Sequence, residues 1–347
     1  MSIDMNRNEP VIVIAEAGVN HNGDVAIAKE LVRAAAKAGA DYVKFQTFKT
    51  ASNISKTAPK ARYQIETTGK EETQYQMVKK LELSDSEHTE IYKECNNANI
   101  KFLSTPFDVD SLDLLLKLGL PMLKIASGEL TNLPLLRAYA SRYSSLGRPV
   151  LLSTGMANLE EISKAVNALT ENGVEKEHIV VLHCTTEYPA PFDEINLRAL
   201  KSMSETLGLP VGYSDHSLGV EVPIAAVTLG AKVIEKHFTL DKTSSGPDHR
   251  SSLEPDEFKY MVQCIRNIEN ALGDGVKRPS PSEKRNALVA RKSIVASKNI
   301  KKGEVFSEMN ITTKRPGTGL SPMYWDDVIG QKSHYNYSED EFIKWQD

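Results

Sequence analysis

The segment KVIEKHF, residues 232–238, begins as an apolar strand and ends in three polar residues, Glu235, Lys236 and His237. Successive side chains of a strand point to opposite faces, so Glu235 and His237 are expected on one face and Lys236 on the other. Two interpretations are open. The segment is either the end of a strand with its charges in solvent, or one part of an active site built where several strands end.

Seven other segments have the same character, and helix-like segments separate them. The strand candidates are residues 11–18, 41–47, 101–107, 121–129, 149–155, 179–186, 210–216 and 232–238. The stretches between them, such as residues 26–40 and 159–173, have apolar residues at helical spacing. Eight alternating units that together span about 250 residues are typical of a (β/α)₈ TIM barrel. A doubly wound open sheet is the alternative, and the number of units favours closure.

The active site of such a barrel lies at the carboxyl ends of its strands. Within the predicted strands, a period of two places Glu235 with His237, and Ser214 with His216, on faces that we expect to point into the barrel mouth. Every candidate strand ends in polar residues, among them Glu16, Lys44, Gln46, Thr105, Lys124, Ser127, Glu129, Ser153, Tyr188, Ser214, His216, Glu235 and His237. Eight polar strand ends that meet at one rim favour the active-site interpretation.

The composition excludes several classes of protein. The 347 residues are 40% hydrophobic and 25% charged, with a net charge of −4, which argues against broad nucleic-acid binding. The first residues, MSIDMNRNEP, lack the apolar segment of a signal peptide, and no apolar run approaches the roughly 18 residues of a membrane span. The three cysteines form no CxxC motif. We therefore expect a cytoplasmic protein without a disulfide framework.

The basic and hydroxyl side chains at the strand ends suit an anionic ligand. Lys44 and Lys124, with Ser127, Ser153 and Ser214, offer charge-assisted hydrogen bonds to a phosphate or a carboxylate. The alternative is that the lysines pair with carboxylates of the rim. A lysine at a barrel strand end is also compatible with a Schiff-base aldolase.

The histidines fall into two groups. His216 and His237 end neighbouring predicted strands with the same inward direction, and could hold a divalent metal with open coordination positions. Core or general-base roles are equally compatible with them. His21, in NHNG, is expected in a loop near the substrate, whereas His88 and His249 are expected in surface or loop positions.

Eleven short motifs link the chain to a known family. They are AEAGVNHNG, VKFQTF, FLSTPFD, KIASGELTNLP, LSTGMA, HCTTEYPAPF, GYSDHS, VIEKHFTLDK, SGPDH and KKGEVF with ITTKRPGTG. With these motifs the chain resembles, over nearly its whole length, the bacterial sialic acid synthases, which join phosphoenolpyruvate to an N-acylated mannosamine-type sugar. The resemblance implies a TIM barrel (residues 1–272) and a small C-terminal antifreeze-like (SAF) domain (residues 287–347). Residues 273–286, rich in Gly, Pro and Ser, are the predicted linker.

The resemblance also implies roles for individual residues. It implies a phosphoenolpyruvate site of Lys44, Thr105, Lys124, Ser127, Ser153 and Ser214, and a sugar site of Gln46, Tyr188, Asp248 and Arg315. Glu16, Glu129 and Glu235 correspond to acidic positions near the reacting carbons, and His216 and His237 to ligands of Mn²⁺ or Mg²⁺. Thr186 stands where some members have asparagine, so no contact is assigned to it.

The expected assembly is a domain-swapped homodimer in which Arg315 reaches the sugar bound by the partner subunit. HCTTEYPAPF and GELTNLP are slightly more similar to N,N'-diacetyllegionaminate synthases than to N-acetylneuraminate synthases. Two alternatives of other classes stay open at this point: the Schiff-base aldolase, and a non-catalytic carbohydrate-binding protein on a barrel scaffold.

Overall fold

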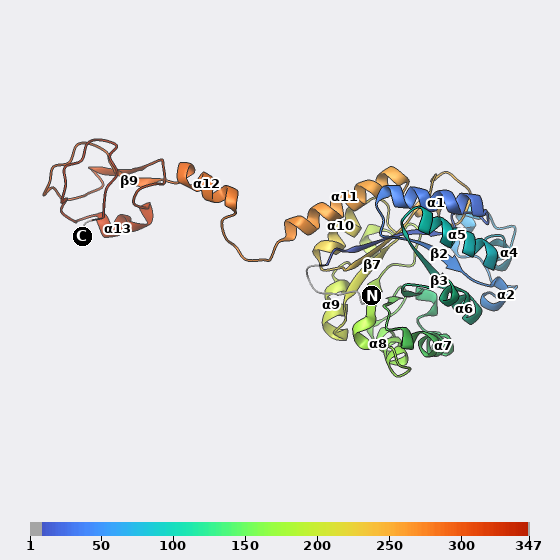
Figure 1. Cartoon of the computed structure of the whole chain (residues 1–347). Coiled ribbons are helices and arrows are strands. Elements are labelled where there is room, and N and C mark those ends of the chain that lie inside the picture. The colour runs from blue at the N-terminus through green and yellow to red at the C-terminus, as the bar shows by residue number, and fades with distance from the viewer. Residues whose placement is uncertain (1–8, 346–347) are drawn as a thin grey trace. The chain divides into compact units, whose positions relative to one another are not determined.

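A computed structural model describes residues 9–345, and the chain divides into two compact units, one ending at Gly273 and the other beginning at Asp274. In the first unit, parallel strands alternate with helices that surround them (Figure 1). The strands are β1 (Ile12–Gly18), β2 (Tyr42–Thr47), β3 (Lys101–Pro106), β4 (Leu123–Ile125), β5 (Val150–Ser153), β6 (Ile179–His183), β7 (Val211–Asp215) and β8 (Val233–His237).

The strand order distinguishes a barrel from an open sheet. The hydrogen-bonded order is β3-β2-β1-β8-β7-β6-β5-β4, so the first strand pairs with the last. Ile12 lies opposite Val233, and Glu16 lies opposite His237. In a doubly wound open sheet the first and last strands would not be neighbours in this way. The predicted (β/α)₈ barrel is therefore confirmed.

The helices of this unit begin at the signals that the sequence contains. Ser84 Oγ accepts a hydrogen bond from the Glu87 N–H, and the Glu87 carboxylate accepts one from the Ser84 N–H, which forms a capping box. The helices are α1 (Val25–Ala38), α2 (Thr50–Asn53), α3 (Arg62–Thr68), α4 (Gln74–Lys79), α5 (Asp85–Asn97), α6 (Val109–Lys117), α7 (Leu133–Tyr143), α8 (Leu159–Thr170), α9 (Ala199–Leu207), α10 (Glu221–Thr228) and α11 (Pro255–Leu272). Within residues 9–345, none of the helices combines the length and the apolar character needed to cross a bilayer.

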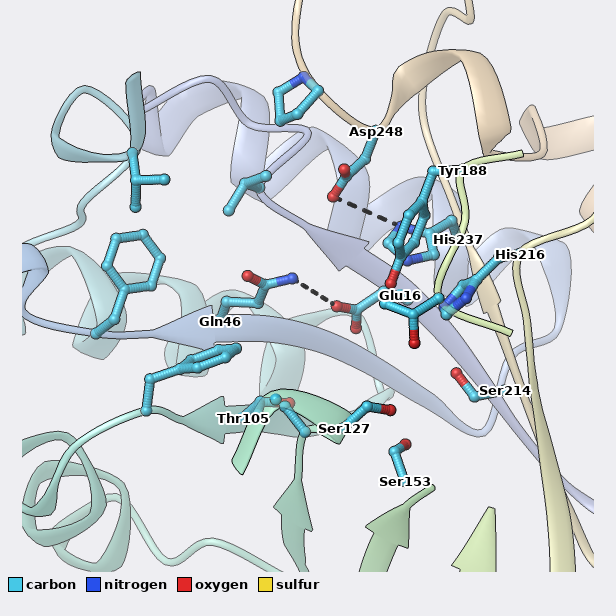
Figure 2. A pocket seen from close by; sticks show the side chains of 18 of the residues that line it. Glu16, Gln46, Thr105, Ser127, Ser153, Tyr188, Ser214, His216, His237 and Asp248 are labelled. Carbon is cyan, nitrogen blue, oxygen red and sulfur yellow. Dashed lines mark hydrogen bonds and ion pairs between the residues drawn. The ribbon is translucent and has the colours of Figure 1, made fainter. Parts of the chain in front are cut away.

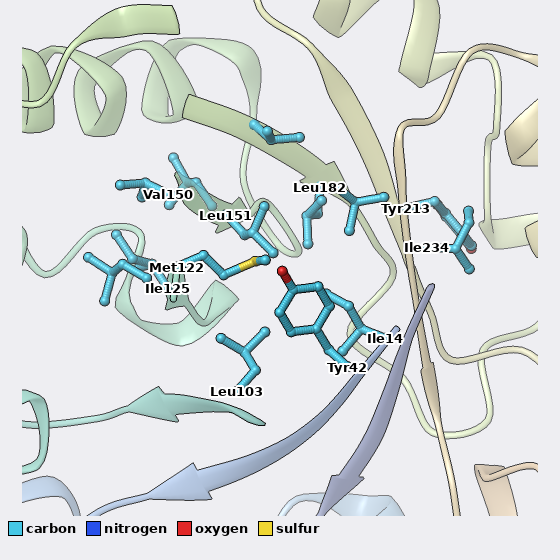
Figure 3. Close-up of a cluster of buried hydrophobic side chains, with 14 of the residues drawn as sticks. Ile14, Tyr42, Leu103, Met122, Ile125, Val150, Leu151, Leu182, Tyr213 and Ile234 are labelled. Carbon is cyan, nitrogen blue, oxygen red and sulfur yellow. The ribbon is translucent and has the colours of Figure 1, made fainter. Parts of the chain in front are cut away.

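Apolar side chains fill the barrel and the layer between strands and helices (Figure 3). Val13, Leu151 and Ile234 have no exposed surface. Each such side chain stabilises the folded state by roughly 1.5–3 kcal/mol relative to an exposed one. This apolar filling leaves the carboxyl mouth as the place where ionisable side chains of several strands meet.

One predicted strand is shorter than expected. Of residues 121–129, only Leu123–Ile125 form a strand, β4, and Ser127–Glu129 form a 3₁₀ helix, η1. Pro121 has no N–H to donate to a ladder, and the Glu129 N–H bonds to the Ala126 carbonyl of its own segment. The alternation of side chains expected for a strand therefore ends before Glu129.

The second unit is small and has its own core. Strands β9 (Ser293–Ala296) and β10 (Ile311–Lys314) pair antiparallel, and Ile294, Phe306 and Ile311 are buried there. The helices of this unit are α12 (Pro281–Ala290) and α13 (Trp325–Val328). The second half of the predicted linker, residues 273–286, contains the beginning of α12 and is therefore partly helical; its bounds stay a prediction. Ser280 caps that helix by accepting from the Glu283 N–H, and Pro281 suits its first position.

Candidate active site

A cavity opens at the carboxyl mouth of the barrel (Figure 2). Strand register brings its side chains together, since Glu16 of β1 lies opposite both Lys44 of β2 and His237 of β8. The predicted site residues that line the cavity are Glu16, Lys44, Gln46, Thr105, Lys124, Ser127, Ser153, Tyr188, Ser214, His216, Glu235, His237 and Asp248. The inward direction predicted for Glu235, His237, Ser214 and His216 is confirmed.

Lys44 lies at the centre of a buried ionic network. Its Nζ is 2.6 Å from Glu16 Oε2 and 3.6 Å from Glu235 Oε2, and it donates a hydrogen bond of 2.9 Å to Thr105 Oγ1. Gln46 Nε2 donates to the other oxygen of Glu16, at 3.2 Å. Lys44 and Glu16 are almost completely buried, so this network is shielded from water.

Lys124, in β4, approaches the carboxylate of Glu235, which Lys44 also approaches. Its Nζ donates a hydrogen bond of 2.8 Å to Ser153 Oγ and lies 3.5 Å from Glu235 Oε1. Ser214 Oγ also donates to Glu235 Oε1, at 2.9 Å. One carboxylate therefore holds two ammonium groups in adjacent positions, with hydroxyl groups beside them.

The carboxyl groups at this site have different pKa values. Burial alone would raise the pKa of Glu235, but Lys124, Lys44 and the Ser214 hydroxyl lower it to about 2. Burial raises the pKa of Glu16, and the neighbouring Glu235 adds to the rise, although Lys44 opposes it. Burial lowers the pKa of Lys124, which Glu235 partly offsets. Glu235 is thus a permanent charge, whereas Glu16 is the carboxyl group with the higher proton affinity.

A close approach of backbone and side chains fixes Ser127. The Gly155 N–H donates to Ser127 Oγ at 3.0 Å, and the sulfur of Cys184 lies 3.2 Å from the same hydroxyl. A Cβ atom at Gly155 would lie 2.2 Å from Thr186 Oγ1, so no larger residue fits there without displacing the wall of the cavity. The Thr186 hydroxyl is buried without a hydrogen-bond partner and lines the cavity.

His216 and His237 lie side by side, with ring centroids 5.3 Å apart. His216 Nδ1 is 2.6 Å from the Thr185 carbonyl, to which it donates, so its Nε2 lone pair is available. His237 Nδ1 is buried without a hydrogen bond. Burial lowers the pKa of both rings, which keeps them neutral, as metal ligands must be. The pair therefore fits a divalent ion. Among residues 9–345, no group of three His, Cys, Asp or Glu side chains is placed to hold a metal ion.

Tyr188 covers the two histidines. Its ring centroid is 4.2 Å from that of His216 and 5.5 Å from that of His237 (Figure 2). The ring of Tyr63 packs against that of Tyr188, with the ring centroids 4.9 Å apart. Asp248 Oδ2 is 3.9 Å from His237 Nδ1, and burial together with Glu16 raises the pKa of Asp248 to about 7. These polar side chains surround the histidine end of the cavity.

An apolar wall, not predicted from the sequence, lines the other side of the mouth. Val19, Phe48 and Phe107 are the first residues after β1, β2 and β3, and they pack with Val78 and Leu81 along the cavity. Phe48 and Phe107 meet edge to face at 6.3 Å. The long connection between β2 and α5 was the available signal, because connections in such units are usually about 2–6 residues and longer ones tend to carry function.

Two predicted site residues are not in the cavity. Glu129 accepts a hydrogen bond of 2.7 Å from Asn132 Nδ2 and does not line the mouth, because η1 replaces the strand that would have directed it there. Arg315 belongs to the second unit, where its Nε donates to the Ala290 carbonyl at 3.0 Å. Its predicted contact with the sugar stays a prediction.

The other histidine predictions need correction. His21 is fully buried and does not line the cavity, and its Nδ1 accepts a hydrogen bond from the Gly23 N–H. His88 and His249 are buried as well, and hydrogen bond to the hydroxyl groups of Thr47 and Thr239. His88 lies on the buried face of α5, and the segments that carry His21 and His249 are buried as well, so neither kind of position implied exposure.

A nearly closed parallel barrel whose ionisable side chains meet at its carboxyl mouth defines an enzyme of the (β/α)₈-barrel class. The NeuB family profile matches residues 31–277, and the SAF domain profile matches residues 291–347. The chain belongs to the NeuB family.

Individual relatives are similar over nearly their whole length. The N,N'-diacetyllegionaminic acid synthase of Campylobacter jejuni is 54% identical, with 96% of this chain and 98% of that protein covered. The protein of the same name from Legionella pneumophila is 44% identical, with 96% and 93% covered. The crystal structure of an N-acetylneuraminic acid (sialic acid) synthetase from Leptospira borgpetersenii, in complex with citrate, is 36% identical and covers 80% of this chain and 90% of its own, with a TM-score of 0.69.

Proposed function

We propose that the protein condenses phosphoenolpyruvate with an N-acylated mannosamine-type sugar, which gives a nine-carbon sialic-type acid and phosphate. The observation that carries the proposal is the convergence of Lys44 and Lys124 on the Glu235 carboxylate, 3.6 and 3.5 Å away. Two ammonium groups fixed side by side among hydroxyl groups suit the phosphate and carboxylate of phosphoenolpyruvate. The names of the relatives support the same reaction.

The reaction joins carbon 3 of phosphoenolpyruvate to the sugar aldehyde, adds water to carbon 2, and breaks the C–O bond to phosphate. Lys44, Lys124 and the hydroxyls of Thr105, Ser127, Ser153 and Ser214 hold the anionic substrate. Positive charge that develops at carbon 2 is stabilised by the ionised Glu235. Glu16, whose pKa is raised by burial, is the carboxyl group that can take the proton from the attacking water. Glu129 is not part of this proposal because it lies outside the cavity.

The sugar would lie between the histidines and the apolar wall. Gln46, Tyr188 and Asp248 offer hydrogen-bonding groups for it. The relatives named for two acetyl groups are 54% and 44% identical, against 36% for the N-acetylneuraminic acid synthetase. A second acetamido group carries a further methyl, which the wall formed by Phe48 and Phe107 suits. N,N'-diacetyllegionaminate is therefore favoured over N-acetylneuraminate as the product.

Mn²⁺ or Mg²⁺ is the proposed cofactor, held by His216 and His237. When bound, the ion supplies a Lewis acid for the sugar aldehyde. The hydrogen bond from His216 Nδ1 to the Thr185 carbonyl leaves Nε2 of this cavity-lining ring as the nitrogen that can bind the ion. A domain-swapped homodimer is the proposed assembly and rests on the family resemblance. The proposed location is the cytoplasm, which the three free cysteines support.

Phosphate release tests the reaction. Purified protein with Mn²⁺ and phosphoenolpyruvate should release phosphate with a diacetamido mannosamine-type sugar, and more slowly with N-acetylmannosamine. Absence of release with every N-acyl mannosamine would refute the proposal. Trapping of a lysine adduct by borohydride would instead establish the Schiff-base aldolase.

Chelation tests the metal. Excess chelator should abolish phosphate release, and Mn²⁺ or Mg²⁺ should restore it. Because a Lewis acid supplies several kcal/mol, His216→Ala should lower the rate at least ~100-fold. Full activity in excess chelator would remove the metal from the proposal.

A further inference from the structure

Lys236 and Asp215 form an ion pair that the proposed chemistry does not use. Both side chains are completely buried, and Lys236 Nζ lies 2.5 Å from Asp215 Oδ2. Neither residue lines the cavity. Lys236 stands between Glu235 and His237 in β8 but points to the opposite face, away from the mouth. Burial of two charges carries a large desolvation penalty, so the pair is weak evidence for a purely stabilising role.

The ion pair joins the strands that carry the two histidines. In the parallel ladder Asp215 of β7 lies opposite Lys236 of β8, and Ser214 lies opposite Glu235. On the inner face Ser214 donates to Glu235 at 2.9 Å, and on the outer face Lys236 pairs with Asp215. Side-chain contacts therefore join β7 and β8 on both faces of the sheet, at the residues that immediately precede His216 and His237.

The same pair fixes the turn after β7. Asp215 Oδ1 accepts from the Ser217 N–H at 3.0 Å and from the Ser217 hydroxyl at 2.8 Å. Lys236 Nζ donates to the Ser217 carbonyl. The residues on both sides of His216 are therefore held by Lys236 and Asp215. The backbone of His216 has one further tie, a hydrogen bond of 2.9 Å from the Ala190 N–H to its carbonyl.

We infer that Lys236 and Asp215 are positioning residues that set the separation and orientation of His216 and His237 for a divalent ion. The inference rests on the metal site of the proposed function. Metal binding requires donor atoms within about 0.2 Å of their preferred distances, so the residues that fix the ligands affect affinity directly. Loss of a supporting contact of this kind typically lowers metal affinity 10–100-fold.

A double variant separates positioning from stability. Replacing a buried ion pair by apolar residues of similar volume is often neutral for stability, whereas removing one partner leaves an unpaired buried charge. Asp215→Leu combined with Lys236→Met removes both charges and all three contacts with Ser217. Lys201→Met is the matched control, because Lys201 pairs with Glu205 at 3.7 Å on the exposed surface.

Binding of Mn²⁺ alone, followed by the electron paramagnetic resonance signal of the free ion, is the main measurement. The double variant should bind Mn²⁺ about 10–100-fold more weakly than the wild type, and the control should not differ. Calorimetric titration without metal should give a phosphoenolpyruvate affinity within about twofold of the wild type, since Lys44 and Lys124 lie on other strands. Thermal unfolding shows which variants are folded.

The outcomes distinguish this inference from the metal proposal. Wild-type Mn²⁺ affinity in the folded double variant would overturn the positioning role and leave the metal site intact. An equal loss of phosphoenolpyruvate affinity would overturn it too, because the damage would then be general. Failure of the wild-type protein to bind Mn²⁺ would overturn both. If the double variant does not fold, Ser217→Ala decides, because it removes one contact of Asp215 and leaves the ion pair in place: weaker Mn²⁺ binding supports positioning, and unchanged binding overturns it.

Discussion

Lys44 and Lys124 reach the same carboxylate but have different surroundings. Lys44 has two carboxylate neighbours, Glu16 and Glu235, which raise its pKa against the effect of burial. Among the residues that the structure describes, Lys124 has only one carboxylate within ion-pair distance, that of Glu235, and it donates a hydrogen bond to the hydroxyl of Ser153. Lys124 is therefore the lysine with more capacity for an incoming anion, and it offers the sharper test of the proposed phosphoenolpyruvate site.

Lys124→Met should weaken phosphoenolpyruvate binding more than sugar binding. Loss of a hydrogen bond to a charged group costs about 1.5–3 kcal/mol, or roughly 10–150-fold in affinity. Calorimetric titration of each substrate measures the two effects separately, with Lys201→Met as the control. A larger loss for the sugar would reverse the assignment of this lysine.

His21 makes stability depend on pH although it lies outside the cavity. Burial, with His88 nearby, lowers the pKa of His21 to about 4, from an ordinary value of 6.5. As the pH falls below 6.5 the unfolded chain takes up a proton that the folded protein refuses, so the free energy of unfolding decreases until about pH 4. The contribution of His21 to stability is thus complete above pH 6.5 and is lost on acidification.

His21→Asn should reduce this pH dependence. Asparagine keeps an acceptor for the Gly23 N–H but does not titrate. Between pH 7 and pH 5 the wild type should lose about 2 kcal/mol more than the variant, measured by urea unfolding. His178→Asn, in the 3₁₀ helix Lys176–His178, is the control and should behave as the wild type. Equal pH dependence of His21→Asn and wild type would contradict the prediction.

At the scale of elements, the packing of β7 between β6 and β8 depends on close contact between neighbouring strands. Gly212 in β7 has no side chain where Leu182 of β6 and Val233 of β8 meet. A Cβ atom at Gly212 would lie 2.5 Å from Leu182 Cδ2 and 2.7 Å from the Val233 carbonyl oxygen. Backbone cannot yield as a flexible side chain does, so an added methyl must separate the strands.

Gly212→Ala should lower the free energy of unfolding by about 1–3 kcal/mol, as overpacking of a close-packed core does. Urea unfolding followed by far-ultraviolet circular dichroism measures the loss. Gly128→Ala is the matched control, because a methyl there meets no atom within 4 Å. Equal stability of the two variants would show that β7 tolerates the shift.

The elements also show which predictions the sequence permits. Alternation along β7 and β8 was sufficient to direct Ser214, His216, Glu235 and His237 inward, because side-chain direction in a strand is a local property. Glu129 could not be predicted in the same way, since its segment leaves the strand at Ala126. The apolar wall depends on long-range packing of the connection between β2 and α5, for which no local pattern exists. Burial of His88 and His249 has the same tertiary origin.

For the whole molecule, the predicted role of Arg315 concerns two subunits rather than one. Its guanidinium suits the oxygen of a sugar N-acyl group, and losing such a hydrogen bond costs about 1.5–3 kcal/mol. The expectation of action across subunits rests on the family resemblance. It can be examined by co-expressing Arg315→Ala and His216→Ala chains that carry different tags, and by purifying the mixed dimer.

Substantial activity should return in the mixed dimer, because one site carries both defects and the other carries none. If Arg315 served its own barrel, each site would keep one defect and the mixed dimer would remain as weak as its parents. A fully active monomer in solution would also contradict the prediction. Mixed dimers that combine either variant with wild-type chains serve as controls for expression and tagging.

The division into two units has a spectroscopic consequence. The chain has two tryptophans, Trp325 and Trp345, and both belong to the unit that begins at Asp274. Trp325 packs against the core of that unit, and Trp345 meets Tyr324 edge to face at 5.3 Å. Fluorescence excited selectively at tryptophan therefore reports on the small unit, and the barrel contributes only through tyrosine. The barrel helices dominate the far-ultraviolet circular dichroism signal. Comparing that signal with the tryptophan emission therefore follows the unfolding of each unit in a single unlabelled sample.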